Sequence, residues 1–172
     1  MRHTIVFVSS TAIGILGYFL IRKLRTPHLN PCPLGYLHIY VGSETGHTLA
    51  LAECLASEAK KFSFTPQVIS LEDFRPMDFT KHDYCVILCS TTADGLPPPN
   101  AKNFLKWLAK RSEDLRKLSY CVFGISKSIE HGCLSAEDIE ASLDSLGATK
   151  LIRRGSAVEG SKEAFVQWTK EL

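Results

Sequence analysis

Short apolar runs alternate with longer stretches in which apolar residues recur at helical spacing. The runs are typical of strands buried in a sheet, and they cover residues 36–41, 67–70, 84–89, 120–124 and 150–153. The helical spacing predicts helices over residues 48–61, 100–110, 135–147 and 162–170. The third of these should begin with a capping box at Ser135 to Asp138 and stop at Gly147.

This regular alternation of strands and helices predicts the fold class. Continuous apolar strands separated by helices are typical of a parallel sheet covered on both faces, so the chain is expected to form a doubly wound, five-stranded α/β sheet. Ligands of such sheets bind at the carboxyl ends of the strands, near the point where the strand order reverses. The loops after the first, third and fourth strands are therefore the places to look for function.

The amino-terminal part of the chain has a different pattern. Residues 4–21 carry no charge, and their length lies within the roughly 17–25 residues that a membrane-spanning helix needs. A cleavable signal peptide or a buried helix are the alternatives. Arg22, Lys23 and Arg25 follow the apolar stretch, which favours an orientation with the remaining chain in the cytosol. The expected organisation is an anchor over 1–25, a proline-rich stalk over 26–35 and one domain over 36–172.

Composition excludes several function classes. The 172 residues carry a formal net charge of +2, which argues against direct nucleic-acid binding driven by bulk charge. None of the six cysteines is arranged as in a structural metal site or a disulfide framework, so they are interpreted as free thiols in a reducing compartment, and no metal is expected. No arrangement of serine, histidine and carboxylates stands out as that of a hydrolase.

Each of the three loops carries polar or small residues. The first, Gly42-Ser-Glu-Thr-Gly-His-Thr48, offers hydroxyl groups and the N–H groups of a helix start, which can bind a phosphate monoester without a cation. A hydroxyl-capped turn without a ligand is the alternative interpretation. The second loop contains the turn Asp94-Gly-Leu-Pro97, and the third begins at Gly124-Ile-Ser-Lys-Ser128 and continues to Glu130-His-Gly132.

Together the three loops resemble the flavodoxin family, in the form that makes up the FMN domain of diflavin reductases. The resemblance covers residue 36 to the C-terminus and depends on Gly42-Ser-Glu-Thr-Gly46, Thr91-x-x-Asp-Gly-x-Pro97 and Gly124 in this order. Asp94-Gly-Leu-Pro97, with Ala101-x-x-Phe-x-x-Trp-Leu108, is also similar to the flavodoxin domain of tRNA wybutosine-synthesis enzymes. Arg154-Gly155 and Phe165-x-x-Trp168 fit the ending of that domain.

The resemblance implies an FMN site built from the three loops, with the first holding the phosphate and the other two flanking the ring. The implied residues are Ser43, Glu44, Thr45, Gly46, His47 and Thr48; then Thr91, Thr92, Ala93, Asp94 and Gly95; and finally Gly124, Ile125, Ser126, Lys127 and His131. Two ring-stacking aromatics of the family are missing, one at Thr92 and one at Ile129 or Glu130, which weakens the expected binding about five- to a hundredfold. Glu44 must point away from the phosphate.

The resulting hypothesis is a membrane-anchored, FMN-binding, flavodoxin-like electron-transfer module. The expected partners are a separate NADPH-dependent reductase, an acceptor protein and a membrane, expected to be the endoplasmic reticulum, bound through residues 4–21. Whether the chain is an enzyme in its own right is left open. Two alternatives remain: a flavin-free interaction module that retains the fold, or the flavodoxin part of a tRNA wybutosine-synthesis protein.

Overall fold

The computed structural model describes residues 34–111, 114–127, 130–159 and 161–172. Its strands are β1 (Gly35–Gly42), β2 (Phe64–Ser70), β3 (Tyr84–Thr91), β4 (Ser119–Ser126), β5 (Thr149–Lys150) and β6 (Gly155–Val158). Its α-helices are α2 (His47–Lys61), α3 (Pro76–Phe79), α4 (Lys102–Lys110), α5 (Leu134–Ser145) and α6 (Lys162–Thr169). Two short 3-10 turns, Leu71–Asp73 and Pro99–Ala101, complete the described elements.

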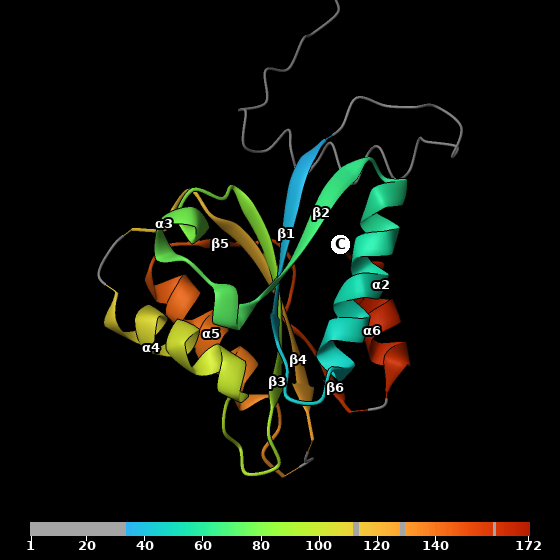
Figure 1. The fold of residues 1–172 in the computed structure, drawn as a ribbon, viewed down its shortest axis with the longest axis vertical. Coiled ribbons are helices and arrows are strands. Elements are labelled where there is room, and N and C mark those ends of the chain that lie inside the picture. The colour runs from blue at the N-terminus through green and yellow to red at the C-terminus, as the bar shows by residue number, and fades with distance from the viewer. Residues whose placement is uncertain (1–33, 112–113, 128–129, 160) are drawn as a thin grey trace, which may run out of the picture. The chain divides into compact units, whose positions relative to one another are not determined.

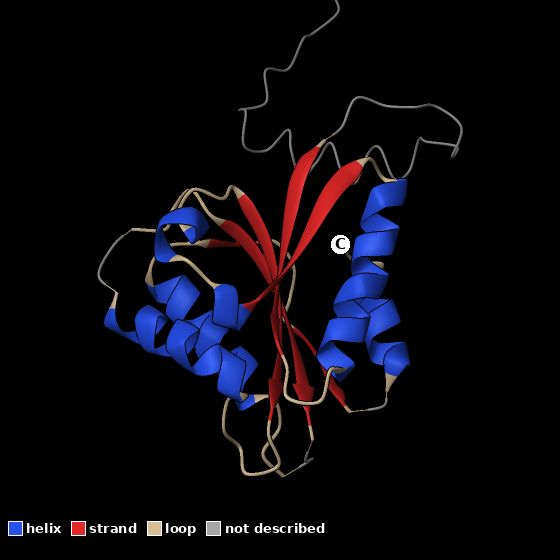
Figure 2. Cartoon of the chain, viewed as in Figure 1, coloured by secondary structure: helices blue, strands red, loops and turns tan. Residues whose placement is uncertain are grey.

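All strand pairs are parallel, and the strand order is β2-β1-β3-β4-β5. Strand β5 pairs with the start of β4, and β6 pairs with the end of β4 on the same side. Helices α2 and α6 cover one face of the sheet, and α3, α4 and α5 lie on the other (Figure 1). Strands and helices therefore form the three layers seen in Figure 2. The strand order reverses between β1 and β3, as in a doubly wound sheet, so the predicted fold class is confirmed.

The two faces of the sheet hold separate apolar clusters. Alternating residues of a strand point to opposite faces, so Ile39 packs under α2 and α6 while Tyr40 packs toward α3, α4 and α5. Strands β3 and β4 are buried after their first residues, in agreement with their continuous apolar runs. This rigid centre holds the ends of β1, β3 and β4 at fixed positions.

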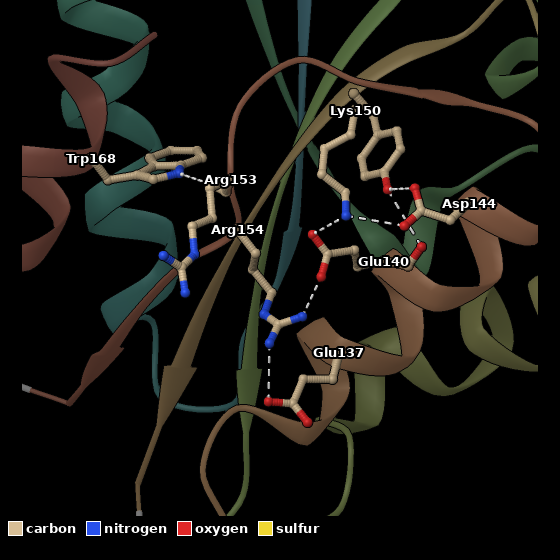
Figure 3. A network of polar contacts seen from close by, with 8 residues as sticks. Glu137, Glu140, Asp144, Lys150, Arg153, Arg154 and Trp168 are labelled. Carbon is tan, nitrogen blue, oxygen red and sulfur yellow. Dashed lines mark hydrogen bonds and ion pairs between the residues drawn. The ribbon is translucent and has the colours of Figure 1, made fainter.

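The strand predicted at 150–153 is wrong in extent. Its position in the sheet is shared by β5, beside the start of β4, and by β6, beside the end of β4. Between them the indole Nε1 of Trp168 donates a hydrogen bond of 3.0 Å to the carbonyl of Arg153, while Arg154 turns toward Glu137 and Glu140 of α5 (Figure 3). The bond from Trp168 takes up the carbonyl of Arg153 in the gap between the two short strands.

The predicted capping box at the start of α5 is also wrong. The helix begins at Leu134, one residue before Ser135, and no side chain caps it from Cys133. Instead the hydroxyl Oγ1 of Thr91, at the end of β3, accepts a hydrogen bond of 3.0 Å from the N–H of Ser135. A residue distant in sequence therefore performs the capping. Gly147 follows α5 with a φ of 83°, as its predicted role at the helix end requires.

The predicted anchor, and the stalk up to residue 33, lie outside the described residues, so both stay predictions. Within the described part of the chain, no helix has the length and apolar character that a membrane crossing requires. Five cysteines lie in that part and all are free thiols, with Cys54 exposed and the others buried. Burial raises the pKa of the Cys89 thiol to about 12, as expected of a small core residue.

Candidate functional site

The ends of β1, β3 and β4 bring three loops together at one edge of the sheet, the lower edge in Figure 1. Loop 1 covers residues 42–48, loop 2 covers 91–97, and loop 3 runs from 124 to 132, with 128 and 129 outside the description. Three short-range contacts, described below, connect these loops to one another. The edge is the one at which ligands of doubly wound sheets bind.

Gly46 in loop 1 directly precedes the first residue of α2. Its φ of 83° lies in the left-handed region, and its N–H donates a hydrogen bond of 3.1 Å to the hydroxyl of Ser43. The first helical hydrogen bond runs from Ala50 to the carbonyl of Gly46. The backbone N–H groups of His47, Thr48 and Leu49 have no acceptor among the described residues, as is usual for a first helical turn.

The backbone at Gly46 leaves open space, because a Cβ built on Gly46 would meet no atom within 4 Å. Three N–H groups without an acceptor at a helix start attract an anion, because the helix dipole adds to their partial positive charge. Loop 1 therefore fits a phosphate monoester, the group that the sequence predicts for it.

Asn100, which the sequence analysis did not identify, fixes loop 1 to the fold. Its side-chain oxygen accepts a hydrogen bond of 3.0 Å from the N–H of Ser43, and its amide nitrogen donates to the carbonyl of Val41 at 3.3 Å and to the hydroxyl of Ser70 at 3.2 Å. The only sequence signal is its position after three prolines and before a helix. Its partners lie 30 to 59 residues away, so local patterns could not reveal them.

Loop 2 is a closed turn. The N–H of Thr92 donates to the carbonyl of Leu96 at 2.8 Å, and the hydroxyl of Thr92 accepts from the N–H of Leu96 at 3.1 Å. Gly95 has a φ of 76°, and a Cβ added to it would lie 3.3 Å from the ring of His131 in loop 3. Ala93 and Asp94 are exposed at the tip. Loops 2 and 3 thus meet at the contact between Gly95 and His131.

Several predicted site residues are buried at the base of the loops. The side chains of Thr48, Thr91, Ile125 and Ser126 are buried. Gly124 is enclosed as well, because a Cβ there would lie 2.5 Å from the Cβ of Cys133. Thr48 lies in α2, and the others lie in β3 and β4. The hydroxyl of Thr91 accepts a hydrogen bond from α5, and its carbonyl accepts one of 3.3 Å from the N–H of Lys127.

Charged side chains connect loop 1 to loop 3 and to the segment after β6. The ammonium of Lys127 lies 2.5 Å from a carboxylate oxygen of Glu44. The hydroxyl of Thr45 donates to the carboxylate of Glu159 at 3.0 Å, and the N–H of Glu159 donates to the carbonyl of Ser126 at 2.8 Å. The hydrogen bond to Glu44 raises the pKa of Lys127. Lys127 thus neutralises the Glu44 carboxylate that the sequence had placed beside a phosphate.

Exposed aliphatic side chains lie in loop 2 and in the elements that follow loop 3. Leu96 belongs to loop 2, Leu134 begins α5 and Val158 ends β6. At Thr92 the structure has a short hydroxyl side chain engaged in the turn. Within the described residues, no group of three or more His, Cys, Asp or Glu side chains could hold a metal ion. Free N–H groups at a helix start and exposed aliphatic side chains suit an organic anion with an apolar part.

A separate polar cavity of about 390 Å³ lies between β1, β2 and α3, at the other half of β1. The imidazoles of His38 and His82 stack there at 3.5 Å between ring centroids, and Tyr40 and His82 share a hydrogen bond of 2.8 Å. Burial, with His38 close by, lowers the pKa of His82 to about 4. His38 is partly buried, stacks on His82 and makes a side-chain hydrogen bond with Gln67.

Comparison with known proteins agrees with this geometry. The sequence profile of the flavodoxin family matches residues 39–168. A sulfite reductase (NADPH) flavoprotein alpha-component from Vibrio cholerae is 28% identical, over 100% of this chain and 30% of its own length. The same component from Thiocapsa roseopersicina is 32% identical, over 86% of this chain and 28% of its own length. The chain spans less than a third of the length of these curated relatives.

Solved structures show the same fold. A flavodoxin from Streptococcus pneumonia superposes with a TM-score of 0.68 and 21% identity, over 80% of this chain and 94% of the other. Oxidised Flavodoxin 1 from Bacillus cereus superposes with a TM-score of 0.66 and 17% identity, over 80% of this chain and 95% of the other. With the profile match extending from β1 to α6, the chain belongs to the flavodoxin family, whose members bind FMN.

Proposed function

We propose that this protein is an electron-transfer module that binds one FMN at loops 1, 2 and 3. One observation carries the proposal: the backbone N–H groups of His47, Thr48 and Leu49 have no acceptor among the described residues, and the space beside Gly46 is open. A phosphate is the part of FMN that such a helix start binds best. Family membership, which rests on the whole domain, supports the same conclusion independently.

The residues have separate tasks in this proposal. The three N–H groups of α2 and the hydroxyls of Ser43 and Thr45 hold the phosphate, and Asn100 keeps Ser43 in position. Loops 2 and 3, which meet at Gly95 and His131, orient the flavin ring. Bound FMN supplies one-electron transfer, and the protein tunes that chemistry through contacts and nearby charge.

The lack of an aromatic side chain at Thr92 predicts modest affinity. An aromatic stack contributes about 0.5–1.5 kcal/mol beyond burial, and aliphatic groups such as Leu96 do not replace it. The phosphate contacts must then carry a larger share of the binding. We therefore expect FMN to be lost in part during purification and to be restored by adding it back.

The test is flavin binding by the full chain, purified in a mild detergent. We expect absorption maxima at about 375 and 450 nm and one FMN per chain after titration. Gly46→Val should abolish binding, because it places a branched side chain at a positive φ in front of the N–H groups. Gly35→Ala is the matched control, since Gly35 also has a positive φ and open surroundings but lies at the far end of β1.

A flavin-free interaction module is the second candidate, and the engagement of Thr92 in its own turn favours it. It predicts a colourless protein whose calorimetric titration with FMN is flat, with Gly46→Val unchanged in every property except stability. Such a result would overturn the proposed function and leave only the fold.

We further propose an NADPH-dependent reductase as the electron donor and a separate acceptor protein. The names of the relatives support the donor: they include sulfite reductase (NADPH) flavoprotein components and a mitochondrial pyruvate dehydrogenase (NADP+) from Euglena gracilis, which is 31% identical over 84% of this chain and 8% of its own length. Stopped-flow mixing with an NADPH-reduced diflavin reductase should show flavin reduction. No transfer to the bound flavin would refute this donor class.

Membrane attachment through residues 4–21, with the domain in the cytosol and the endoplasmic reticulum as the membrane, remains part of the proposal. The uncharged apolar sequence and the basic residues that follow it support an anchor. After carbonate extraction of cell membranes the full chain should stay in the pellet. Its release into the supernatant would refute the anchor without affecting the flavin site.

A further inference from the structure

Lys127 contacts a carboxylate of loop 1. Its ammonium lies 2.5 Å from a carboxylate oxygen of Glu44, and the charge of Glu159 also raises the pKa of Lys127. Glu159 in turn accepts a hydrogen bond of 3.0 Å from the hydroxyl of Thr45. Glu44, Lys127 and Glu159 are called here the carboxylate bridge. Its three members come from loop 1, loop 3 and the segment after β6, so it connects these three segments.

Glu44 lies in the loop that leads into the three free N–H groups of α2, and Glu159 is bonded to Thr45 of the same loop. Without Lys127, loop 1 would have two uncompensated carboxylates beside a site for a dianion. Carboxylates close to the site repel a ligand that carries a phosphate dianion, and they do not repel an uncharged ligand. The Thr45 hydroxyl already donates its hydrogen bond to the Glu159 carboxylate. An incoming phosphate must therefore displace Glu159 as the acceptor of that bond.

We propose that Lys127 is the positioning residue that makes loop 1 selective for a phosphorylated flavin, by holding Glu44 away from the phosphate, while Glu159 competes with that phosphate for Thr45. This rests on the proposed function of the loops. Lys127 touches Glu44 and acts through it. Its side chain is only 21% exposed, so the contact with Glu44 is held in place better than an ordinary surface ion pair.

The proposal is tested by comparing FMN with riboflavin, which carries the same ring without the phosphate. Dissociation constants for both are measured by flavin fluorescence on the full chain. Lys127→Gln should weaken FMN binding about tenfold and change riboflavin binding less than about twofold. Glu159→Gln should strengthen FMN binding about threefold, because the amide competes less well for Thr45.

Two further variants separate charge from structure. Glu44→Gln combined with Lys127→Gln should restore FMN affinity to within about twofold of the wild type, because no uncompensated charge remains at this pair. Lys61→Gln is the matched control: Lys61 also lies 2.5 Å from a carboxylate, that of Glu58, but at the far end of α2. It should leave both flavin affinities unchanged.

The outcomes are distinct. Equal weakening of FMN and riboflavin by Lys127→Gln would mean a purely structural role and would overturn the inference, as would unchanged FMN affinity. Failure of the double variant to recover would also overturn it. In each of these cases a wild-type chain that binds FMN leaves the proposed function intact. A wild-type chain that binds neither flavin overturns the proposed function and this inference together.

Discussion

Asn100 offers a direct test of how the fold positions loop 1. Its side chain makes three hydrogen bonds, to Ser43, Val41 and Ser70. Each such bond contributes about 0.5–1.5 kcal/mol to stability, and Asn100→Ala removes all three. Because the site is only half-buried, water can replace part of the loss. We expect the free energy of unfolding to fall by about 2 kcal/mol.

The same change should affect ligand binding. Without Asn100 the N–H of Ser43 has no acceptor, and the hydroxyl of Ser43 no longer holds Gly46 at a fixed place. Loop 1 must then become ordered while FMN binds, and the free energy that this ordering costs lowers the affinity for FMN. We expect FMN to bind about five- to tenfold more weakly.

Urea unfolding followed by circular dichroism measures the stability change, and fluorescence titration measures FMN affinity. Asn103→Ala is the matched control, because Asn103 is an exposed residue of α4 whose side chain makes no hydrogen bond among the described residues. It should leave the unfolding midpoint unchanged or raise it slightly, since alanine favours a helix. If Asn100→Ala and Asn103→Ala behave alike in both assays, the proposed role of Asn100 is refuted.

Three other predictions concern stability and are measured by urea unfolding. Gly124→Ala should destabilise the domain by about 1–3 kcal/mol, because the added Cβ would lie 2.5 Å from that of Cys133; an unchanged midpoint would contradict this packing. Glu140→Gln should cost about 1–2 kcal/mol, since a carboxylate only 14% exposed ion-pairs with two cations (Figure 3); equal stability at high and low salt would argue against it. His82 has a folded pKa of about 4 against 6.5 ordinarily, so the unfolded chain takes up the proton first and stability should fall from pH 6.5 toward pH 4. His82→Gln should reduce that pH dependence. If the stability of the variant depends on pH as that of the wild type does, other groups cause the fall in stability.

Local patterns in the sequence were sufficient for most elements of the fold, although they did not reveal α3 (Pro76–Phe79). The continuous apolar runs of β1, β3 and β4 and the helical spacing of α2 and α4 each reflect contacts that repeat along a single element. The errors lie where a distant residue supplies the contact. Thr91 caps α5 in place of Ser135, and Trp168 interrupts the ladder at Arg153.

The candidate site divides in the same way. The phosphate loop could be predicted because a helix start after Gly46 offers its N–H groups whatever the surroundings are. Asn100 and Glu159 could not be assigned their contacts, because their partners in loop 1 lie 57 and 114 residues away. Likewise, Glu44 alone is an unexplained carboxylate, and only the folded chain brings Lys127 to it.

The amino-acid sequence by itself determined the parallel sheet, its flanking helices and the three loops, because apolar periodicity and turn residues act over a few positions. Tertiary structure decided which side chains support the loops from within, which carboxylates face them and which cation offsets those charges. Such contacts join segments far apart along the chain, and they exist only after the sheet has brought the ends of its strands to a common edge.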